Sequence, residues 1–122
     1  MANRLVTALG LAALLAPAAA SAQTAANGAA VYQDRCVSCH ALTGAGQGPS
    51  LAGVVGRKAG TLPGYGGYSD ALKASGLVWT AANLDRFLQG PTKLVPGTAM
   101  RAMVADAAER ADLIAYLTSL KR

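Results

Sequence analysis

The segment Cys36-Val37-Ser38-Cys39-His40 holds the residues of this chain best suited to chemistry. Two thiols stand three residues apart and an imidazole follows at once, which is the Cys-x-x-Cys-His pattern of covalent c-type haem attachment. Residues i and i+3 lie on the same side of a helical turn, so both thiols can reach the vinyl groups of one porphyrin. His40, the only histidine of the chain, is then held beside the ring, where it can ligate the iron. The segment therefore predicts one haem c, attached through Cys36 and Cys39, with His40 as an iron ligand.

Three other uses of the cysteine pair remain open at this point. A thioredoxin-like redox pair needs a βαβ setting, and the sequence shows no βαβ pattern. A structural zinc site needs four sulfur or imidazole ligands, whereas the chain offers two cysteines and one histidine. A plain disulfide in a secreted protein would need the thiols alone. The Cys-x-x-Cys-His pattern favours haem over all three.

The first 22 residues differ in composition from the rest of the chain. Arg4 precedes an apolar run, and Ala20-Ser21-Ala22 fits a small-residue cleavage site. The alternative is an uncleaved membrane anchor, but Pro17 interrupts the apolar run, which is short for a membrane span. We predict a signal peptide over residues 1–22, export to the periplasm, no stable membrane span after cleavage, and a single domain over residues 23–122.

The charge of the chain predicts its class of partner. The 122 residues carry a formal charge of +5, and removal of Arg4 with the signal peptide reduces it to +4. Such a charge favours acidic partner surfaces. Nucleic acid is the competing partner for a basic chain, but the sequence has no Lys/Arg cluster and no nucleic-acid-binding motif.

A domain this small often needs a stabilising group, and a buried porphyrin would complete its apolar core.

Hydrophobic spacing and capping residues predict an all-α fold. The expected helices run over residues 25–35 with Asn27 as cap, 68–75 capped at Ser69, 81–89 capped at Thr80, and onward from Asp106. The last helix carries an apolar stripe of Leu113, Ile114, Leu117 and Leu120, and Asp106 with Glu109 resembles a capping box. The glycine-rich segment 44–67 and the segment 92–99 are expected to be loops. No segment has a convincing strand pattern.

The iron of an electron carrier is often held by one histidine and one methionine, so a methionine is expected as the second ligand opposite His40. Met1 lies in the predicted signal peptide, which leaves Met100 and Met103. Met100 follows a turn that contains Pro96-Gly97, which would project its side chain from a loop, whereas Met103 lacks that context. Either methionine could instead fill a gap in the core. The turn favours Met100 without excluding Met103.

Taken in order, these residues resemble the class I cytochromes c, most closely their mitochondrial and soluble bacterial branch. The resemblance covers the whole of residues 23–122 and rests on Gly28, Tyr32, Cys36-Val37-Ser38-Cys39-His40, Gly48-Pro49-Ser50-Leu51, Gly56-Arg57-Lys58, Tyr68, Trp79-Thr80, Pro91, Pro96-Gly97-Thr98-Ala99-Met100 and Asp112-Leu113-Ile114-Ala115-Tyr116-Leu117. It implies three main helices and several short ones around one covalent haem. It also implies that Met100 is the second iron ligand.

The resemblance implies further contacts around the haem. The carbonyl of Pro49 would accept the Nδ1 proton of His40 and fix the ring. Hydrogen bonds to one haem propionate would come from Arg57, Tyr68 and Trp79, and to the other from Thr98. Without the family, Trp79 is better explained as a core residue and Arg57 as a solvated charge.

The resemblance also implies a close contact between the first and last helices, and the sequence departs from the family pattern at three places. Gly28 would let the N- and C-terminal helices cross closely, beside Tyr32 and Tyr116. Phe87 replaces a tyrosine that lies near the ligand sulfur in mitochondrial members, and Ala102 replaces an aromatic residue. The segment from residue 40 to 49 is shorter than in those members and lacks lysine. The departure at Phe87 bears on the reduction potential of the haem. The departures at Ala102 and in residues 40–49 bear on the surface that partners would contact.

The function implied by the resemblance is one-electron transfer in a respiratory or photosynthetic chain, without enzyme activity. Electrons would pass from a quinol-oxidising complex or dehydrogenase to a terminal oxidase or reductase, and the protein is expected to be a monomer. Arg35, Lys93 and Arg101 would surround the haem edge and attract these acidic redox partners. The alternatives are a dedicated electron-transfer subunit of a periplasmic dehydrogenase complex and, less favoured, a haem peroxidase or gas-binding protein.

Overall fold

The computed structural model describes residues 10, 12 and 18–121, so most of the predicted signal peptide over residues 1–22 lies outside the described residues. The helices in this part of the chain are α1 (Ala18–Arg35), α2 (Asp70–Ala74), α3 (Ala81–Gln89), α4 (Pro91–Leu94) and α5 (Ala107–Ser119). Among the same residues, strand-like pairing is limited to one isolated antiparallel bridge between Lys58 and Val78. The predicted all-α fold is confirmed.

Three predicted N-caps are present, at Ser69, Thr80 and Asp106. Each side-chain oxygen accepts a hydrogen bond from the backbone N–H three residues further on, at 3.1, 3.1 and 2.9 Å respectively. Each bond satisfies an N–H group that has no partner within its own helix. The capping box at Asp106 is formed on one side only, because the Glu109 carboxylate instead makes an ion pair with Arg35 at 3.0 Å.

Two boundary predictions are wrong. The first helix begins at Ala18, so Asn27 lies inside α1 and is not its cap. The residues before it are mostly alanine, which favours continuation of the helix. The segment predicted as a loop after Gly90 begins with the short helix α4, which has Pro91 at its first position. Proline suits that position because its missing N–H is not needed there and its φ is already helical.

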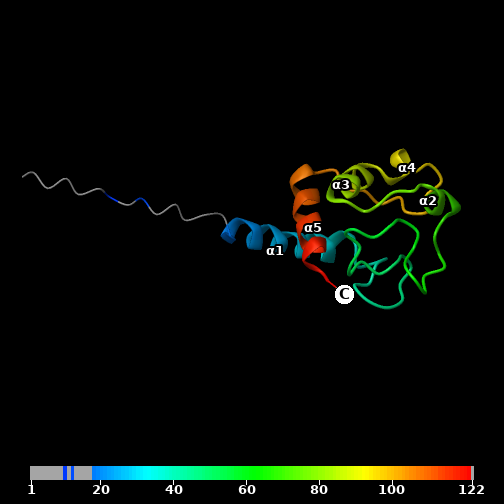
Figure 1. Ribbon diagram of the computed structural model, residues 1–122, viewed down its shortest axis with the longest axis horizontal. Helices are drawn as coiled ribbons and strands as arrows, with labels where there is room; N and C mark the ends of the chain where they lie inside the picture. The colour runs from blue at the N-terminus through cyan, green and yellow to red at the C-terminus, as the bar shows by residue number, and fades with distance from the viewer. Residues whose placement is uncertain (1–9, 11, 13–17, 122) are drawn as a thin grey trace, which may run out of the picture.

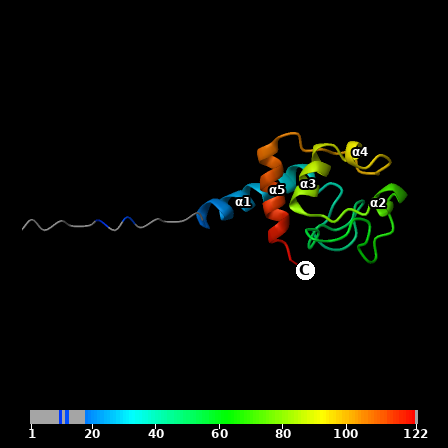
Figure 2. The ribbon, with the colours of Figure 1, turned by 45° about the horizontal axis from the view of Figure 1, so that its top comes forward.

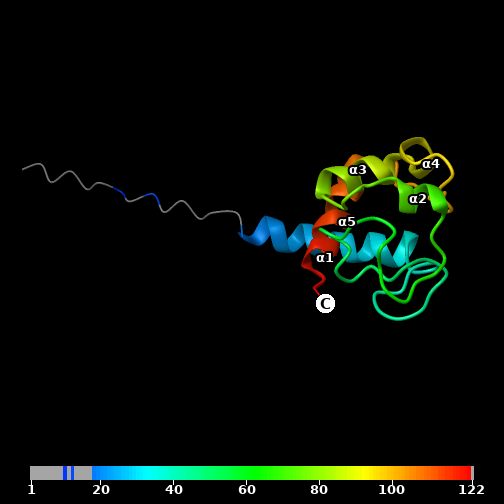
Figure 3. The same cartoon turned by 45° about the vertical axis from the view of Figure 1, so that its right-hand side comes forward.

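Helices α1 and α5 cross, and the crossing depends on Gly28 (Figure 1). A Cβ atom at this position would collide with the backbone carbonyl of Asp112 and would lie 2.7 Å from Tyr116 Cβ. Beside the contact, the rings of Tyr32 and Tyr116 lie 5.8 Å apart. The predicted close approach at Gly28 is therefore present. Figure 2 and Figure 3 show from two further sides that α2, α3 and α4 lie together beyond this crossing.

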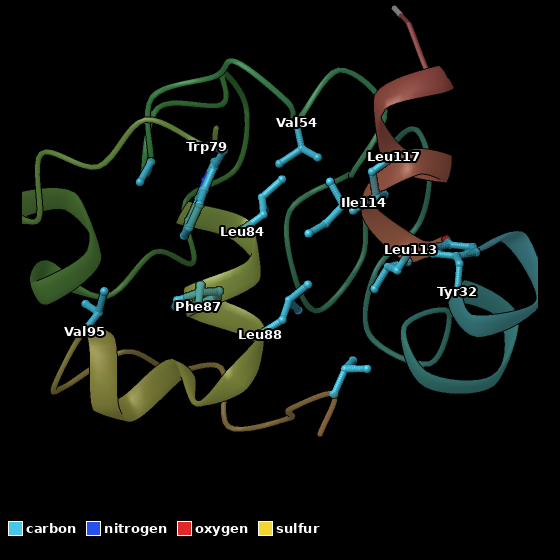
Figure 4. Close-up of a cluster of buried hydrophobic side chains, with 12 residues drawn as sticks. Tyr32, Val54, Trp79, Leu84, Phe87, Leu88, Val95, Leu113, Ile114 and Leu117 are labelled. Atoms are coloured by element: carbon cyan, nitrogen blue, oxygen red, sulfur yellow. The ribbon is translucent and has the colours of Figure 1, made fainter. Parts of the chain in front are cut away.

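The hydrophobic core lies between the α1–α5 pair and α3. Figure 4 shows Leu84 and Leu88 of α3 pointing toward α5, from which Leu113 and Ile114 approach them. Three of the four residues of the predicted stripe lie on α5 and are buried, while Leu120, which follows the helix, is partly buried against the core. The long segment from residue 36 to 69 contains no helix and covers one side of this core. This arrangement leaves a cavity beside the core, into which the loops direct their side chains.

Candidate haem site

Two cavities lie between the loops and the helices, with volumes of about 340 and 110 Å³. They adjoin, because both are lined by Cys36, His40, Pro49, Tyr68, Leu72 and Met100. The smaller cavity is mainly apolar and reaches the core residues Leu84, Leu113 and Leu117. The larger cavity has the size of a small ligand site, and a mainly apolar lining with a few polar groups is typical of cofactor sites.

The Cys-x-x-Cys-His segment lines the larger cavity, directly after α1 ends at Arg35. A turn follows the helix, in which the His40 N–H donates to the Cys36 carbonyl at 2.9 Å. Both cysteines are free thiols, with Cys36 half-buried and Cys39 exposed. Burial raises the pKa of Cys36 to about 11, so this thiol is protonated at neutral pH. The two thiols therefore face one cavity without being paired to each other.

Two hydrogen bonds hold His40, and the backbone at Gly48 passes close to its ring. Its Nδ1 lies 2.7 Å from the carbonyl oxygen of Pro49, the contact that the family resemblance implied. Because a carbonyl can only accept, Nδ1 carries the proton and Nε2 keeps its lone pair for a metal. The backbone carbonyl of His40 accepts a hydrogen bond from the Tyr32 hydroxyl at 2.6 Å. A Cβ atom at Gly48 would lie 2.7 Å from His40 Nδ1, so glycine is required for this loop to pass the ring.

Of the two candidate methionines, Met100 lines both cavities, whereas Met103 lines neither and is 53% exposed. The turn before Met100 is closed by a hydrogen bond of 3.0 Å from the Thr98 N–H to the Val95 carbonyl. Gly97 adopts a φ of +91°, which favours glycine at this position. The turn that favoured Met100 in the sequence therefore directs this residue, and not Met103, toward the cavities.

The donor set and the cavity fit a haem c better than a zinc ion. The residues that the structure describes contain no group of three or more His, Cys, Asp or Glu that could hold a metal ion. They do provide two free thiols, an imidazole with its Nε2 lone pair and a thioether, all lining one apolar cavity. These are the groups that attach a c-type haem and ligate its iron.

Comparison with known proteins decides the family. The sequence pattern of the family described as Cytochrome c matches residues 25–121 of the chain. This chain belongs to the cytochrome c family. Its cofactor is haem c with its iron, and its function is one-electron transfer.

Individual relatives agree with this assignment. Cytochrome c 2.1 of Caenorhabditis briggsae is 46% identical over 93 residues, which cover 74% of this chain and 82% of the relative. Cytochrome c2 of Rhodopila globiformis is 46% identical over 94 residues, which cover 75% of this chain and 88% of the relative. The solved structure of cytochrome cH from Methylobacterium extorquens is similar with a TM-score of 0.73 and 45% identity, covering 78% of this chain and 97% of that one.

The four residues predicted to bind the haem propionates also lie at the site of this cytochrome. Arg57, Tyr68 and Trp79 line the smaller cavity, and Thr98 lines the larger one. The Arg57 Nη2 donates to the carbonyl of Ser50 at 2.9 Å, and the Tyr68 hydroxyl accepts from the Leu62 N–H at 3.3 Å. Both side chains are thus held by loop backbone at the cavity wall. Their role toward the propionates stays a prediction.

The sequence did not single out Tyr65, although it lines the larger cavity. Its hydroxyl donates to the carbonyl of Gln47 at 2.7 Å, and its ring meets Tyr68 edge-on at 4.7 Å. It thereby joins two parts of the glycine-rich segment, residues 44–67, at the wall of the larger cavity. The segment has no periodic pattern, so its one aromatic residue gave no signal in the sequence.

The three basic residues predicted at the haem edge differ in their surroundings. Arg35 and Arg101 line the larger cavity, but Lys93 lies on α4 and does not. Arg35 makes an ion pair with Glu109 at 3.0 Å and lies 3.8 Å from Asp34. Its charge is therefore largely compensated within the protein. Among the described residues, no ion pair includes Lys93 or Arg101, so these two remain the candidates for attracting an acidic partner.

Proposed function

We propose that this protein carries single electrons through a haem c ligated by His40 and Met100. The observation that supports the proposal is that two segments far apart in the sequence, the turn after α1 and the loop after α4, line the same pair of cavities. When bound, the haem supplies an iron that cycles between the ferric and ferrous states. Because His40 and Met100 would both hold the iron, a substrate would find no open place on it, which favours a carrier over an enzyme.

The residues of the chain would hold and shield this group. Cys36 and Cys39 would form its two thioether bonds, and the Pro49 carbonyl would keep the proton on Nδ1 of His40. Leu51, Val54, Leu84 and Leu113 would exclude water from the buried side of the cavity. Arg57, Tyr68, Trp79 and Thr98 would bind the propionates. Burial and His/Met ligation both favour a comparatively high reduction potential.

The chain is proposed to act in the periplasm after cleavage between Ala22 and Gln23. The family match begins at residue 25, close to that boundary. No helix among the described residues has the length and apolar character of a membrane span. The proposed donors are a quinol-oxidising complex or a dehydrogenase, and the proposed acceptors are a terminal oxidase or reductase. The surface charge suits acidic partners, and the working form is proposed to be a monomer.

A redox titration with optical spectra, on protein purified from the periplasm, tests this function. We expect one reversible one-electron transition, c-type haem spectra, and a far-red sulfur-to-iron band in the ferric state. Carbon monoxide added to the ferrous protein should leave the spectrum unchanged, because His40 and Met100 would both hold the iron. Rapid binding of carbon monoxide would instead indicate an open iron site and overturn the carrier function.

Phe87 gives a prediction about the potential. Its ring is buried, contacts Trp79 at 4.8 Å between centroids, and lines the smaller cavity together with Met100. The site therefore has no hydroxyl from this residue. Phe87→Tyr should raise the reduction potential, because a hydroxyl bonded to the Met100 sulfur would draw electron density from it and favour ferrous iron. A potentiometric titration measures the shift, and an unchanged or lower potential would contradict this geometry.

Lys93 gives a prediction about partner association. Lys93→Glu should slow electron exchange with the natural partner at low ionic strength, on the order of a few-fold, because steering by opposite charge raises the association rate. The difference should shrink at high salt. Lys121→Glu, which makes the same charge change at the C-terminal end, should have much less effect. Stopped-flow rates across ionic strength make the comparison, and equal effects would show that net charge alone governs association.

A further inference from the structure

The segment from residue 101 to 106, between Met100 and α5, has no secondary structure and yet is firmly attached. Val104, four residues after Met100, is only 3% exposed. Its N–H donates to the Leu88 carbonyl of α3 at 2.8 Å. The Arg110 guanidinium of α5 reaches back to the same segment, where Nη1 donates to the carbonyls of Val104 at 3.0 Å and Ala105 at 2.8 Å.

Arg110 is itself fixed by a second element. It is 8% exposed, and its Nε donates to Asp85 Oδ1 of α3 at 2.8 Å. The other carboxylate oxygen, Oδ2, accepts from Gln89 Nε2 at 2.8 Å. The hydrogen bond from Arg110 holds the pKa of Asp85 below its usual range, so the carboxylate is ionised at neutral pH. A guanidinium suits this position because its planar fork can serve a carboxylate and backbone carbonyls at once.

We propose that Arg110 is a positioning residue for Met100, which it holds toward the haem by tying the following segment to α3 and α5. The inference rests on the proposed function, in which Met100 is an axial ligand. On the N-terminal side, the turn from Val95 to Thr98 already fixes the loop. On the C-terminal side, Arg110 accounts for two of the backbone hydrogen bonds that hold the segment. Releasing them leaves the segment after Met100 held by the Val104 N–H bond to the Leu88 carbonyl and by burial of Val104, so the Met100 loop should open more easily from that side.

Arg110→Lys is the decisive variant, because lysine keeps the charge but cannot reproduce the fork. Imidazole added to the ferric protein competes with the thioether only when the Met100 loop opens, so its apparent Kd reports that opening. We expect Arg110→Lys to lower this Kd on the order of tenfold. The reason is that losing hydrogen bonds from a charged group makes opening of the loop more favourable by an amount of that order. The Val104 amide should also exchange its hydrogen faster, a readout independent of iron ligation.

Two controls separate positioning from general stability. Arg86→Lys makes the same chemical change on an exposed site of α3 and should leave the imidazole Kd unaltered. Tyr116→Leu removes a ring from the α1–α5 contact and should lower the free energy of unfolding while changing the Kd less than twofold. If Arg110→Lys does not fold, Asp85→Asn, which removes the ionised partner, is measured in its place with the same expectation.

The outcomes are distinct. A wild-type protein without the far-red band would overturn ligation by Met100, and the inference with it. A wild-type protein with the band, and an imidazole Kd unchanged in Arg110→Lys, would overturn the inference alone. The same result follows if Tyr116→Leu lowers the Kd as much as Arg110→Lys for an equal loss of unfolding free energy, because Arg110 would then be only structural.

Discussion

A variant with both Cys36→Ala and Cys39→Ala is expected to retain no haem after acid–organic extraction, whereas wild-type protein should keep all of its colour. The two thiols line the larger cavity and are not joined to each other, so each is available for one thioether bond. The effect should extend to the fold, because the walls of both cavities would lose the group against which they pack. We therefore also expect loss of most helical circular dichroism.

Ser38→Ala is the matched control, since Ser38 lies between the two cysteines and is exposed. It should retain haem and helicity at wild-type levels. Each single cysteine variant should keep one thioether and give haem that is still covalently bound, in lower yield. Partition of the wild-type haem into the organic phase would contradict covalent attachment.

Met100→Ala is expected to abolish the far-red sulfur-to-iron band of the ferric protein and to allow carbon monoxide to bind the ferrous form. Its side chain is the one thioether among the described residues that lines the cavities. Removing it opens one axial position and should lower the reduction potential, because methionine ligation raises it. Optical titration with carbon monoxide and a potentiometric titration measure both effects.

Met103→Ala provides the comparison, because Met103 is three residues away, 53% exposed and outside both cavities. This variant should retain the band, the potential and the insensitivity to carbon monoxide. Survival of the band in Met100→Ala together with its loss in Met103→Ala would reverse the assignment of the ligand.

The sequence by itself determined the features that depend on neighbouring residues. The Cys-x-x-Cys-His spacing predicted the attachment site, because residues three apart on a helical turn lie on the same side and so bring both thiols together. The caps at Ser69, Thr80 and Asp106 were predictable, because each acts on an N–H only three residues away. The resemblance to a known family added long-range contacts, such as His40 with Pro49 and the crossing at Gly28, which spacing alone does not supply.

Only the tertiary structure decided features that join distant parts of the chain. From its own residues the sequence left both Met100 and Met103 open, and the fold directs only Met100 toward the cavities. Arg35 was expected to attract partners, but packing of α1 against α5 brings it to Glu109 and compensates its charge. The role of Arg110 could not be predicted from the sequence, because an arginine on a helix is usually a surface charge. Its contacts with Asp85 of α3 and with the carbonyl of Val104 appear only in the folded structure. Such contacts join residues that are far apart in the sequence and form only when helices and loops pack, so no local pattern in the sequence predicts them.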